Sequence, residues 1–134
     1  MAFGKSLVIC PPFTGQLVSE GGAAVPGARV IRRWTWAWKE TGETNETVAD
    51  DNGHFRFDEV RRSSLSAMFL PHEPSMTEKI FVVIDGEERL LWATGKTNYD
   101  PDPARPVDML CYVDREPTYG NTSSGTCEAR STAQ

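Results

Sequence analysis

The sequence predicts an all-β protein, a single antiparallel β-sandwich of about seven or eight strands. Three observations lead to this prediction. Short runs of strand-forming residues alternate with turn residues at a spacing of roughly eight to twelve positions, which is typical of sandwiches and barrels. Segments with helical periodicity are almost absent. The chain of 134 residues is long enough for one domain with a modest core and too short for two ordinary domains.

The first part of the chain predicts three strands separated by turns. The strands are expected at 13–19, 28–38 and 43–49, and a turn rich in glycine and proline is expected at 20–28. In the first strand, Phe13, Gly15 and Leu17 share one face because side chains alternate with a period of two. The polar segment ETNETVA is compatible with a strand that pairs with the strand before it.

The segment 48–57, VADDNGHFRF, has the residue types of either a metal loop or a β-turn. Phe55 and Phe57 are expected to enter the core from one strand. Aspartate and asparagine bond to their own backbone in turns and glycine adopts positive φ, so 50–53 is expected to be a turn. A calcium loop would need ligands at alternate positions; Glu59 has the position of the distal ligand, but the alternate ligands are missing. We therefore predict that this cluster bends the backbone and performs no reaction.

The second part of the chain predicts a hairpin, a proline-rich loop and a last strand. A short helical turn is expected around 65–69, the loop at 94–106 and the last strand at 107–113. The pair Asp85-Gly86 between two apolar runs is the strongest short-range signal of a hairpin. In the last strand, Met109, Cys111 and Val113 are expected to line the core. The predicted organisation is an N-terminal extension at 1–9, the sandwich at 10–116 and a flexible tail at 117–134.

Composition and charge argue against several classes of partner. The net charge is −5 and lysine and arginine form no block, so nucleic acid is not an expected partner. No apolar run approaches the roughly 18 residues that span a bilayer, so no membrane span is expected. The chain has only two histidines, and its three cysteines lack the spacing of zinc ligands, so neither a metal ion nor a cofactor is expected. The apolar piece 7–9 is too short for the core of a signal peptide, which leaves a cytosolic protein and a mature exported chain as alternatives.

Three tryptophans at alternate positions are the most unusual feature of the chain. Trp34, Trp36 and Trp38 are expected to stand on one face of a strand, where Trp34 belongs to the core. Trp36 or Trp38 is expected near the surface, where the strand ends, and both are candidate binding residues, because an exposed aromatic strip would stack on sugar rings or anchor a protein partner. Arg32 on the same face indicates that this face is partly open. The pair Arg32-Arg33, with Arg33 on the opposite face, is a candidate for binding a carboxylate, and a solvated surface position is the alternative.

The loop NYDPDPARP at 98–106 is the second candidate for binding. Tyr99, Asp100 and Asp102 are its aromatic and acidic side chains, and three prolines stiffen it. A stiff loop on a rigid sandwich loses little entropy on docking, although an ordinary connection between strands would look the same. The pair His72-Glu73 resembles part of a catalytic base, but no serine or cysteine nucleophile can be assigned to it, so no catalytic residue is expected.

The segments GQLVSEGGAAVPGARVIR and VADDNGHFRFDEV together resemble the transthyretin-like, or carboxypeptidase regulatory-like, domain. That family has a Pro-Gly-Ala turn and a later T-D-x-x-G-x-F/Y-x-F hairpin, and 26–28, Asp50, Gly53, Phe55 and Phe57 take these places. Ala49 replaces the family's threonine. The resemblance covers about residues 13–60 and implies a transthyretin-like Greek-key sandwich. It implies little about function, because the fold carries many binding roles.

A bacterial family of unknown function resembles nearly the whole chain, through ICPPFTG, IRRWTWAW, FLPHEP, IDGEERLLW and MLCYV. Members of that family look like neighbours of type VI secretion genes, which implies an effector-associated or immunity role. Its two matching cysteines are Cys10 and Cys111, so the resemblance implies a disulfide between them and leaves Cys127 unpaired on the tail. Such a bridge implies an oxidising compartment, hence the periplasm, whereas two buried thiols would allow the cytoplasm.

These observations predict a non-catalytic, protein-binding module. The resemblance makes an immunity protein the main hypothesis, one that neutralises a secreted type VI effector toxin, such as a metallopeptidase or lipase, by occluding its active site. The alternative is a carbohydrate-binding or cell-envelope accessory module that uses an exposed tryptophan strip. An enzyme such as a transthyretin-like hydrolase is a third and weaker interpretation, because the two histidines are scattered.

Overall fold

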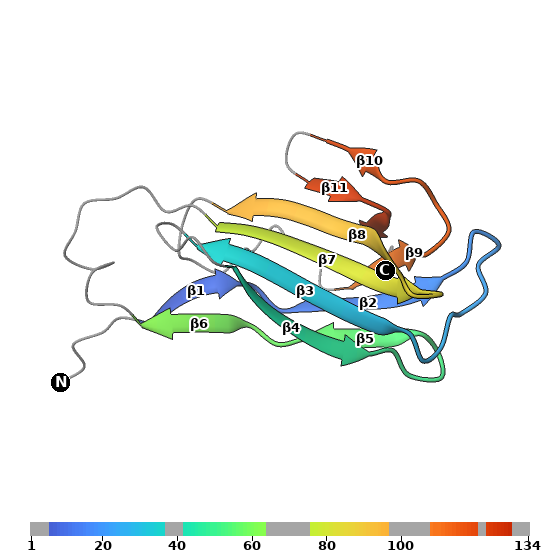
Figure 1. Cartoon of the computed structure of the whole chain (residues 1–134), viewed down its shortest axis with the longest axis horizontal. Coiled ribbons are helices and arrows are strands. Elements are labelled where there is room, and N and C mark those ends of the chain that lie inside the picture. Colours follow the sequence, from blue (N-terminus) through green and yellow to red (C-terminus); the bar gives the residue numbers. More distant parts are fainter. Residues whose placement is uncertain (1–5, 37–41, 64–75, 97–107, 121–122, 130–134) are drawn as a thin grey trace, which may run out of the picture.

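A computed structural model shows a protein built of β-strands (Figure 1). It describes residues 6–36, 42–63, 76–96, 108–120 and 123–129. Over these ranges it contains twelve strands and no helix. The strands are β1 (Ser6–Cys10), β2 (Phe13–Val18), β3 (Arg29–Trp36), β4 (Glu43–Val48), β5 (His54–Phe57), β6 (Val60–Ser63), β7 (Met76–Ile84), β8 (Glu87–Lys96), β9 (Met109–Tyr112), β10 (Thr118–Tyr119), β11 (Ser123–Gly125) and β12 (Cys127–Ala129).

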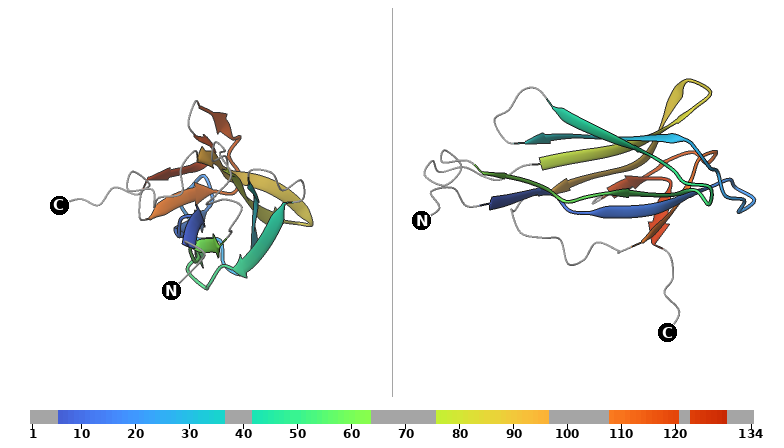
Figure 2. Two further views of the ribbon diagram at one scale, coloured as in Figure 1. Left: turned by 90° about the vertical axis from the view of Figure 1, so that its left-hand side faces the viewer. Right: turned by 90° about the horizontal axis from the view of Figure 1, so that it is seen from below.

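Two sheets pack face to face, which confirms the predicted β-sandwich (Figure 2). One sheet has six strands in the order β10-β11-β8-β7-β3-β4, and the other has four in the order β12-β9-β2-β5. The strand pairs are antiparallel except β2–β9, which is parallel. The described ranges contain no helix with the length and apolar character needed to cross a lipid bilayer.

Strands β1 and β6 form a separate ribbon that continues the β2–β5 pair and packs against the six-stranded sheet where β3 ends and β7 begins (Figure 1). The break between β1 and β2 falls at 11–12, two prolines, which have no N–H to donate to a neighbouring strand. Val8 and Ile9 are buried in this ribbon. Residues 6–9 of the extension predicted at 1–9 therefore belong to a strand of this ribbon, and residues 1–5 lie outside the described ranges.

The main core is built by inward-facing residues of both sheets. From the four-stranded sheet come Phe13, Leu17, Phe55, Phe57, Met109 and Cys111, and from the six-stranded sheet Val30, Ile80, Val82 and Leu91. These positions confirm the period-two patterns read from the first, fourth and last predicted strands. A second cluster lies toward the β1–β6 ribbon and consists of Ile9, Cys10, Trp34, Trp36, Val60 and Met76.

Two predicted turns are confirmed by their backbone geometry. Asp85 and Gly86 have φ of 53° and 78°, so both central residues of the β7–β8 hairpin are left-handed, as a type I′ turn requires. In the acidic segment, one side-chain oxygen of Asp50 accepts the backbone N–H groups of Asn52 and His54, each at 2.9 Å. The acidic segment is thus a turn between β4 and β5 that leads Phe55 and Phe57 into the core.

Gly53 completes this turn and also touches the neighbouring strand. Its φ is 81°, and a Cβ there would lie 2.5 Å from the carbonyl oxygen of Leu17. Gly27 has a similar φ of 74°, but a Cβ added there would meet nothing within 4 Å. Alanine variants at these two positions therefore distinguish two free-energy costs: that of a left-handed backbone at both positions, and that of steric overlap at Gly53 alone.

We expect Gly27→Ala to lower the free energy of unfolding by about 1–2 kcal/mol, the cost of placing an L-residue in the left-handed region. Gly53→Ala is expected to lower it by about 1–3 kcal/mol more, because the methyl group displaces the Leu17 backbone. Urea unfolding of both variants beside the wild-type chain measures the difference. Equal losses would show that Gly53 is constrained by its φ alone.

Asp50 also makes a pH-dependent contribution to stability. The hydrogen bonds from the backbone of His54 and then of Asn52 hold the pKa of Asp50 below its ordinary value. A carboxyl whose pKa falls on folding stabilises the protein above the unfolded pKa, and this stabilisation disappears as pH falls through the folded pKa. Asp50→Asn keeps an acceptor oxygen but does not titrate.

We therefore expect the stability difference between wild type and Asp50→Asn to be constant near neutral pH and to shrink in acid. Urea unfolding across the acid range measures it. Asp51→Asn removes the same charge from the next residue, which makes none of these turn hydrogen bonds, and serves as the control. Identical pH profiles for the two variants would contradict the role of Asp50.

The C-terminal segment belongs to the sandwich, contrary to the flexible tail predicted from residue 117 onward. β11 pairs with β8 at the edge of the six-stranded sheet, and β12 pairs with β9 at the edge of the other. Between them the backbone N–H of Thr126 donates to Leu91 at 2.8 Å, and Gly125 approaches Leu91 so closely that a Cβ would lie 2.1 Å from its carbonyl oxygen. Residues 118–120 and 123–129 therefore close one side of the sandwich, and 121–122 and 130–134 lie outside the described residues.

The disulfide joins Cys111 to Cys127, which corrects the predicted bridge between Cys10 and Cys111. The two cysteines face each other directly in the β9–β12 pair, with their Cα atoms 4.0 Å apart. Cys10 lies in the second cluster with its side chain fully buried. The prediction is wrong because nothing in the residue pattern of the tail, which carries Cys127, indicates a strand beside β9.

Candidate binding surface

The predicted site residues divide into three groups. Arg33 is exposed on the outer face of the six-stranded sheet. Trp36 is only 4% exposed and packs in the second cluster beside Trp34, so its prediction as an exposed binding residue is wrong. Trp38, Tyr99, Asp100 and Asp102 lie outside the described residues, as do the predicted helical turn at 65–69 and the pair His72-Glu73.

Arg32 is the physical reason why the tryptophan face is closed. It is fully buried, and its guanidinium lies 4.8 Å from the ring centroid of Phe57 and 5.4 Å from that of Trp34. It donates to the backbone oxygen of Asp58 at 2.8 Å and forms an ion pair with buried Glu78 at 3.6 Å. Arg32 thus joins the sheets from inside, and the expectation that it marks an open face is wrong.

The outer face of the six-stranded sheet is the broad surface on which Arg33 stands. Residues that pair directly across antiparallel strands point to the same face, so the strand register identifies their neighbours. One row crosses all six strands from β10 to β4, and we call it the outer row: Tyr119, Ser124, Ala93, Lys79, Arg33 and Thr44. At its β10 end Tyr119 is 78% exposed, which is unusual for a large aromatic side chain.

Arg33 is held rigidly on this face. Its two terminal nitrogens donate to the two carboxylate oxygens of Glu88 at 2.6 and 2.8 Å, and its guanidinium lies 5.1 Å from the ring centroid of Phe81. The pair reaches from β3 to β8 across β7, where Phe81 stands. The hydrogen bonds from Arg33 hold the pKa of Glu88 below its ordinary value. This bridge leaves the positive charge of Arg33 compensated.

Lys79 stands next to Arg33, but no carboxylate of the described residues compensates its positive charge. The side chain is exposed, and its ammonium group forms no ion pair with any residue that the structure describes. Sequence reasoning does not select Lys79, because a single lysine in a strand is common. No sequence signal could have selected it, because 77, 78 and 79 in MTEKIF are all polar, and only the structure shows that 77 and 79 face outward while 78 is buried.

Two shallow hollows lie on either side of Lys79 and Thr77. The Arg33 hollow, about 410 Å³, is lined by Arg33, Thr35, Glu43, Thr44, Thr77 and Lys79. The Ser124 hollow, about 250 Å³, is lined by Thr77, Lys79, Ala93, Gly95, Gly120 and Ser124, among others. Their linings are mainly hydroxyl-bearing and small residues. The outer row therefore combines an exposed tyrosine, hydroxyl groups, two cations and room for partner side chains.

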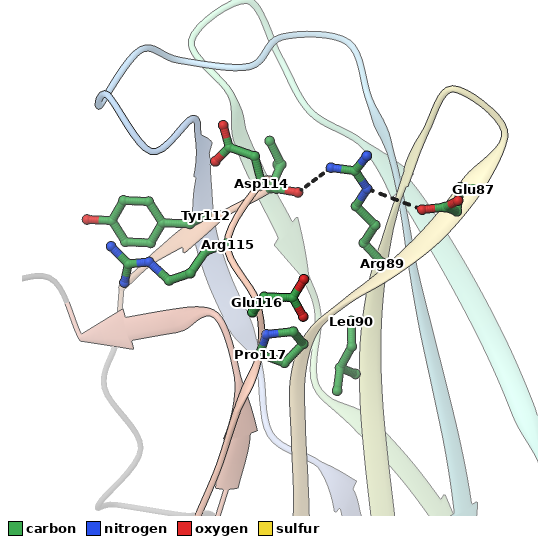
Figure 3. A pocket seen from close by; sticks show the side chains of 9 residues that line it. Glu87, Arg89, Leu90, Tyr112, Asp114, Arg115, Glu116 and Pro117 are labelled. Atoms are coloured by element: carbon green, nitrogen blue, oxygen red, sulfur yellow. Dashed lines mark hydrogen bonds and ion pairs between the residues drawn. The ribbon is translucent and has the colours of Figure 1, made fainter.

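A third hollow, about 370 Å³, lies at the end of the sandwich between β8 and the segment after β9 (Figure 3). Its arginines are already engaged. Arg115 lies 3.6 Å from the ring centroid of Tyr112 and donates to both carboxylate oxygens of Glu20 at 2.9 and 3.1 Å, which lowers the pKa of Glu20. Arg89 donates to the backbone oxygen of Val113 at 2.9 Å. These contacts link loops and strands, so we assign this hollow a structural role.

The described residues offer no metal centre: among them, no group of three or more His, Cys, Asp or Glu side chains is placed to hold a metal ion. The acidic turn at 50–53, where a metal loop was the alternative, uses its carboxylate on backbone N–H groups instead. The outer row offers hydrogen-bonding hydroxyl groups, one compensated cation, one uncompensated cation and an exposed aromatic ring.

The protein is thus an all-β sandwich with a broad polar face on its six-stranded sheet. A comparison of its sequence with models of protein families shows the family to which it belongs. Residues 13–115, more than half of the chain, match the model of a family described as a domain of unknown function, DUF6795, and the chain belongs to that family. No curated protein matches it significantly. No solved structure matches it significantly either.

Proposed function

We propose that the protein is a non-catalytic, protein-binding module that docks its partner on the outer row. The observation that carries this proposal is the composition of that row, where hydroxyl groups and small residues surround Arg33 and Lys79 and an exposed tyrosine stands at the β10 end. Binding surfaces of antibodies have similar chemistry, because tyrosine supplies contact area at low entropic cost and small polar residues adapt their hydrogen bonds. The rigid sheet beneath keeps these groups in place.

The finer proposal is that the partner is a type VI secretion effector and that this chain is its immunity protein. It rests on the resemblance to a family whose members look like neighbours of type VI secretion genes. Docking on a broad sheet face would block the active-site cleft of an effector of the metallopeptidase or lipase class. The Cys111–Cys127 disulfide supports a periplasmic location, because disulfides persist in oxidising compartments.

The carbohydrate-binding alternative depended on an exposed strip of tryptophans. Trp34 and Trp36 are buried in the second cluster, so the described part of this strip offers no platform for a sugar ring. No other observation on the described residues favours that function.

A binding experiment with a rescue assay tests the proposal. The purified chain is mixed with each product of the adjacent genes, and affinity is measured by calorimetry; in parallel, the chain is co-expressed with each product directed to the periplasm. We expect one product to bind and its toxicity to be relieved. Ser124→Arg, which puts a large charged side chain on the outer row, should abolish both effects, whereas Thr14→Arg on β2 of the opposite sheet should preserve them. Absence of binding and of rescue with every product would reject the proposal.

A further inference from the structure

We infer that the partner presents a carboxylate-bearing side chain to Lys79, with its flanking residues seated in the Arg33 and Ser124 hollows. The inference rests on the proposed function above and names the chemistry of its partner. Arg33, the cation next to Lys79 on the outer row, donates with both terminal nitrogens to Glu88. Lys79 is therefore the cation of this row whose charge no described residue compensates.

The distribution of charge favours an acidic partner group. The chain as a whole carries −5, yet the outer row contains two cations and no acidic residue. Acidic side chains do occur around it: Glu43 lines the Arg33 hollow, and Glu78 lines the Ser124 hollow but is buried in the interior. A single exposed ammonium group on a protein of net negative charge is complementary to a single acidic side chain of a partner. One uncompensated lysine is a poor match for a nucleic acid, which requires many cations.

The shape of the surface also fits a side chain that approaches Lys79 from above. On the β8 side the row continues with Ala93, whose small side chain leaves space over the sheet, and Gly95 lies in the next row of the same hollow. Hydroxyl groups line both hollows, and a carboxylate accepts hydrogen bonds from hydroxyls as well as from an ammonium group. Burial under a partner would remove water and strengthen this ion pair relative to an exposed one.

Charge-removing variants test the inference. Affinity for the adjacent-gene product that binds is measured by calorimetry for wild type, Lys79→Gln, Lys79→Arg and Arg56→Gln, at low and at high salt. Arg56 is an exposed cation on β5 of the opposite sheet, so its variant makes the same change in net charge away from the outer row. We expect Lys79→Gln to weaken binding by roughly tenfold or more, and the other two variants to stay within about threefold of wild type. The affinity of Lys79→Gln should also depend less on salt than that of wild type.

Two results would overturn the inference while leaving the proposed function intact. One is binding by Lys79→Gln that equals wild type and Arg56→Gln at both salt concentrations. The other is a wild-type chain that self-associates in sedimentation and loses this self-association in Lys79→Gln, which would make a second copy the occupant. A wild-type chain that binds no adjacent-gene product would reject the proposed function and the inference with it.

Discussion

Replacing Arg32 with methionine is expected to lower the free energy of unfolding by about 3–5 kcal/mol, the largest effect that we expect of any single change. Arg32 is 0% exposed and Glu78 is 4% exposed, and they form an ion pair at 3.6 Å. Removing the guanidinium leaves the carboxylate of Glu78 buried without that cation, and the backbone oxygen of Asp58 without its donor. Because small domains are stable by only about 5–15 kcal/mol, we expect a large shift in the urea midpoint.

The double variant Arg32→Met with Glu78→Met is the control for this mechanism. Replacing a buried ion pair by apolar residues of similar size is often neutral, whereas breaking one costs several kcal/mol. The double variant should therefore be more stable than Arg32→Met alone, although the backbone acceptor near Asp58 stays unsatisfied. A double variant less stable than the single one would show that packing, and not charge, explains the loss.

Replacing Cys127 with serine is expected to lower the free energy of unfolding by about 3 kcal/mol, the value for a closed loop of about 15 residues. The Cys111–Cys127 bridge spans 16 positions and ties β12 to β9. Without it the unfolded chain gains conformational freedom, and the short strand β12, with three residues, loses its covalent anchor. Urea unfolding with and without a dithiol reductant measures the effect.

Two controls separate the bridge from the packing of the side chains. The reductant should destabilise wild type and leave Cys127→Ser unchanged, because that variant has no bridge to reduce. Peptide mapping of the unreduced wild-type protein should recover 111 linked to 127. Recovery of Cys10 linked to Cys111 instead would contradict the structure and restore the pairing implied by family resemblance.

Local patterns predict much of this fold. The period-two positions of β2, β5 and β9 lie in the core, and the Asp85-Gly86 hairpin and the turn at Asp50 form where their residue types indicate. These features are predictable because they depend on residues close in sequence: glycine at positive φ, a carboxylate that caps its own backbone, and alternation along one strand.

Three errors have a common cause, which is contact between residues far apart in the chain. Arg32 indicates an open face by its residue type, but it is buried because Glu78 and the Asp58 carbonyl, both distant in sequence, satisfy it. Trp36 is buried because the β1–β6 ribbon contributes Ile9 and Val60 to its cluster. The small polar residues of the tail carry no hydrophobic pattern and so predict flexibility, whereas residues 123–125 pair with β8 and residues 127–129 pair with β9.

The candidate surface shows the same division. Residue type alone selects Arg33, and it does lie on the surface. Lys79 becomes its neighbour, and Ser124 and Tyr119 join the same row, only through the register of four further strands, which no local pattern specifies. The predicted binding residues Trp38, Tyr99, Asp100 and Asp102 remain predictions, since they lie outside the described residues.

The sequence by itself determined the all-β class, the turns and the inward faces of the main strands, because backbone conformation and hydrophobic alternation act over a few residues. Only the tertiary structure decided which cysteine partners Cys111, how Arg32 is buried and which side chains form the outer row. The physical reason is that strand pairing brings together residues from opposite ends of the chain, and the free energy of those contacts depends on the register of the whole sheet.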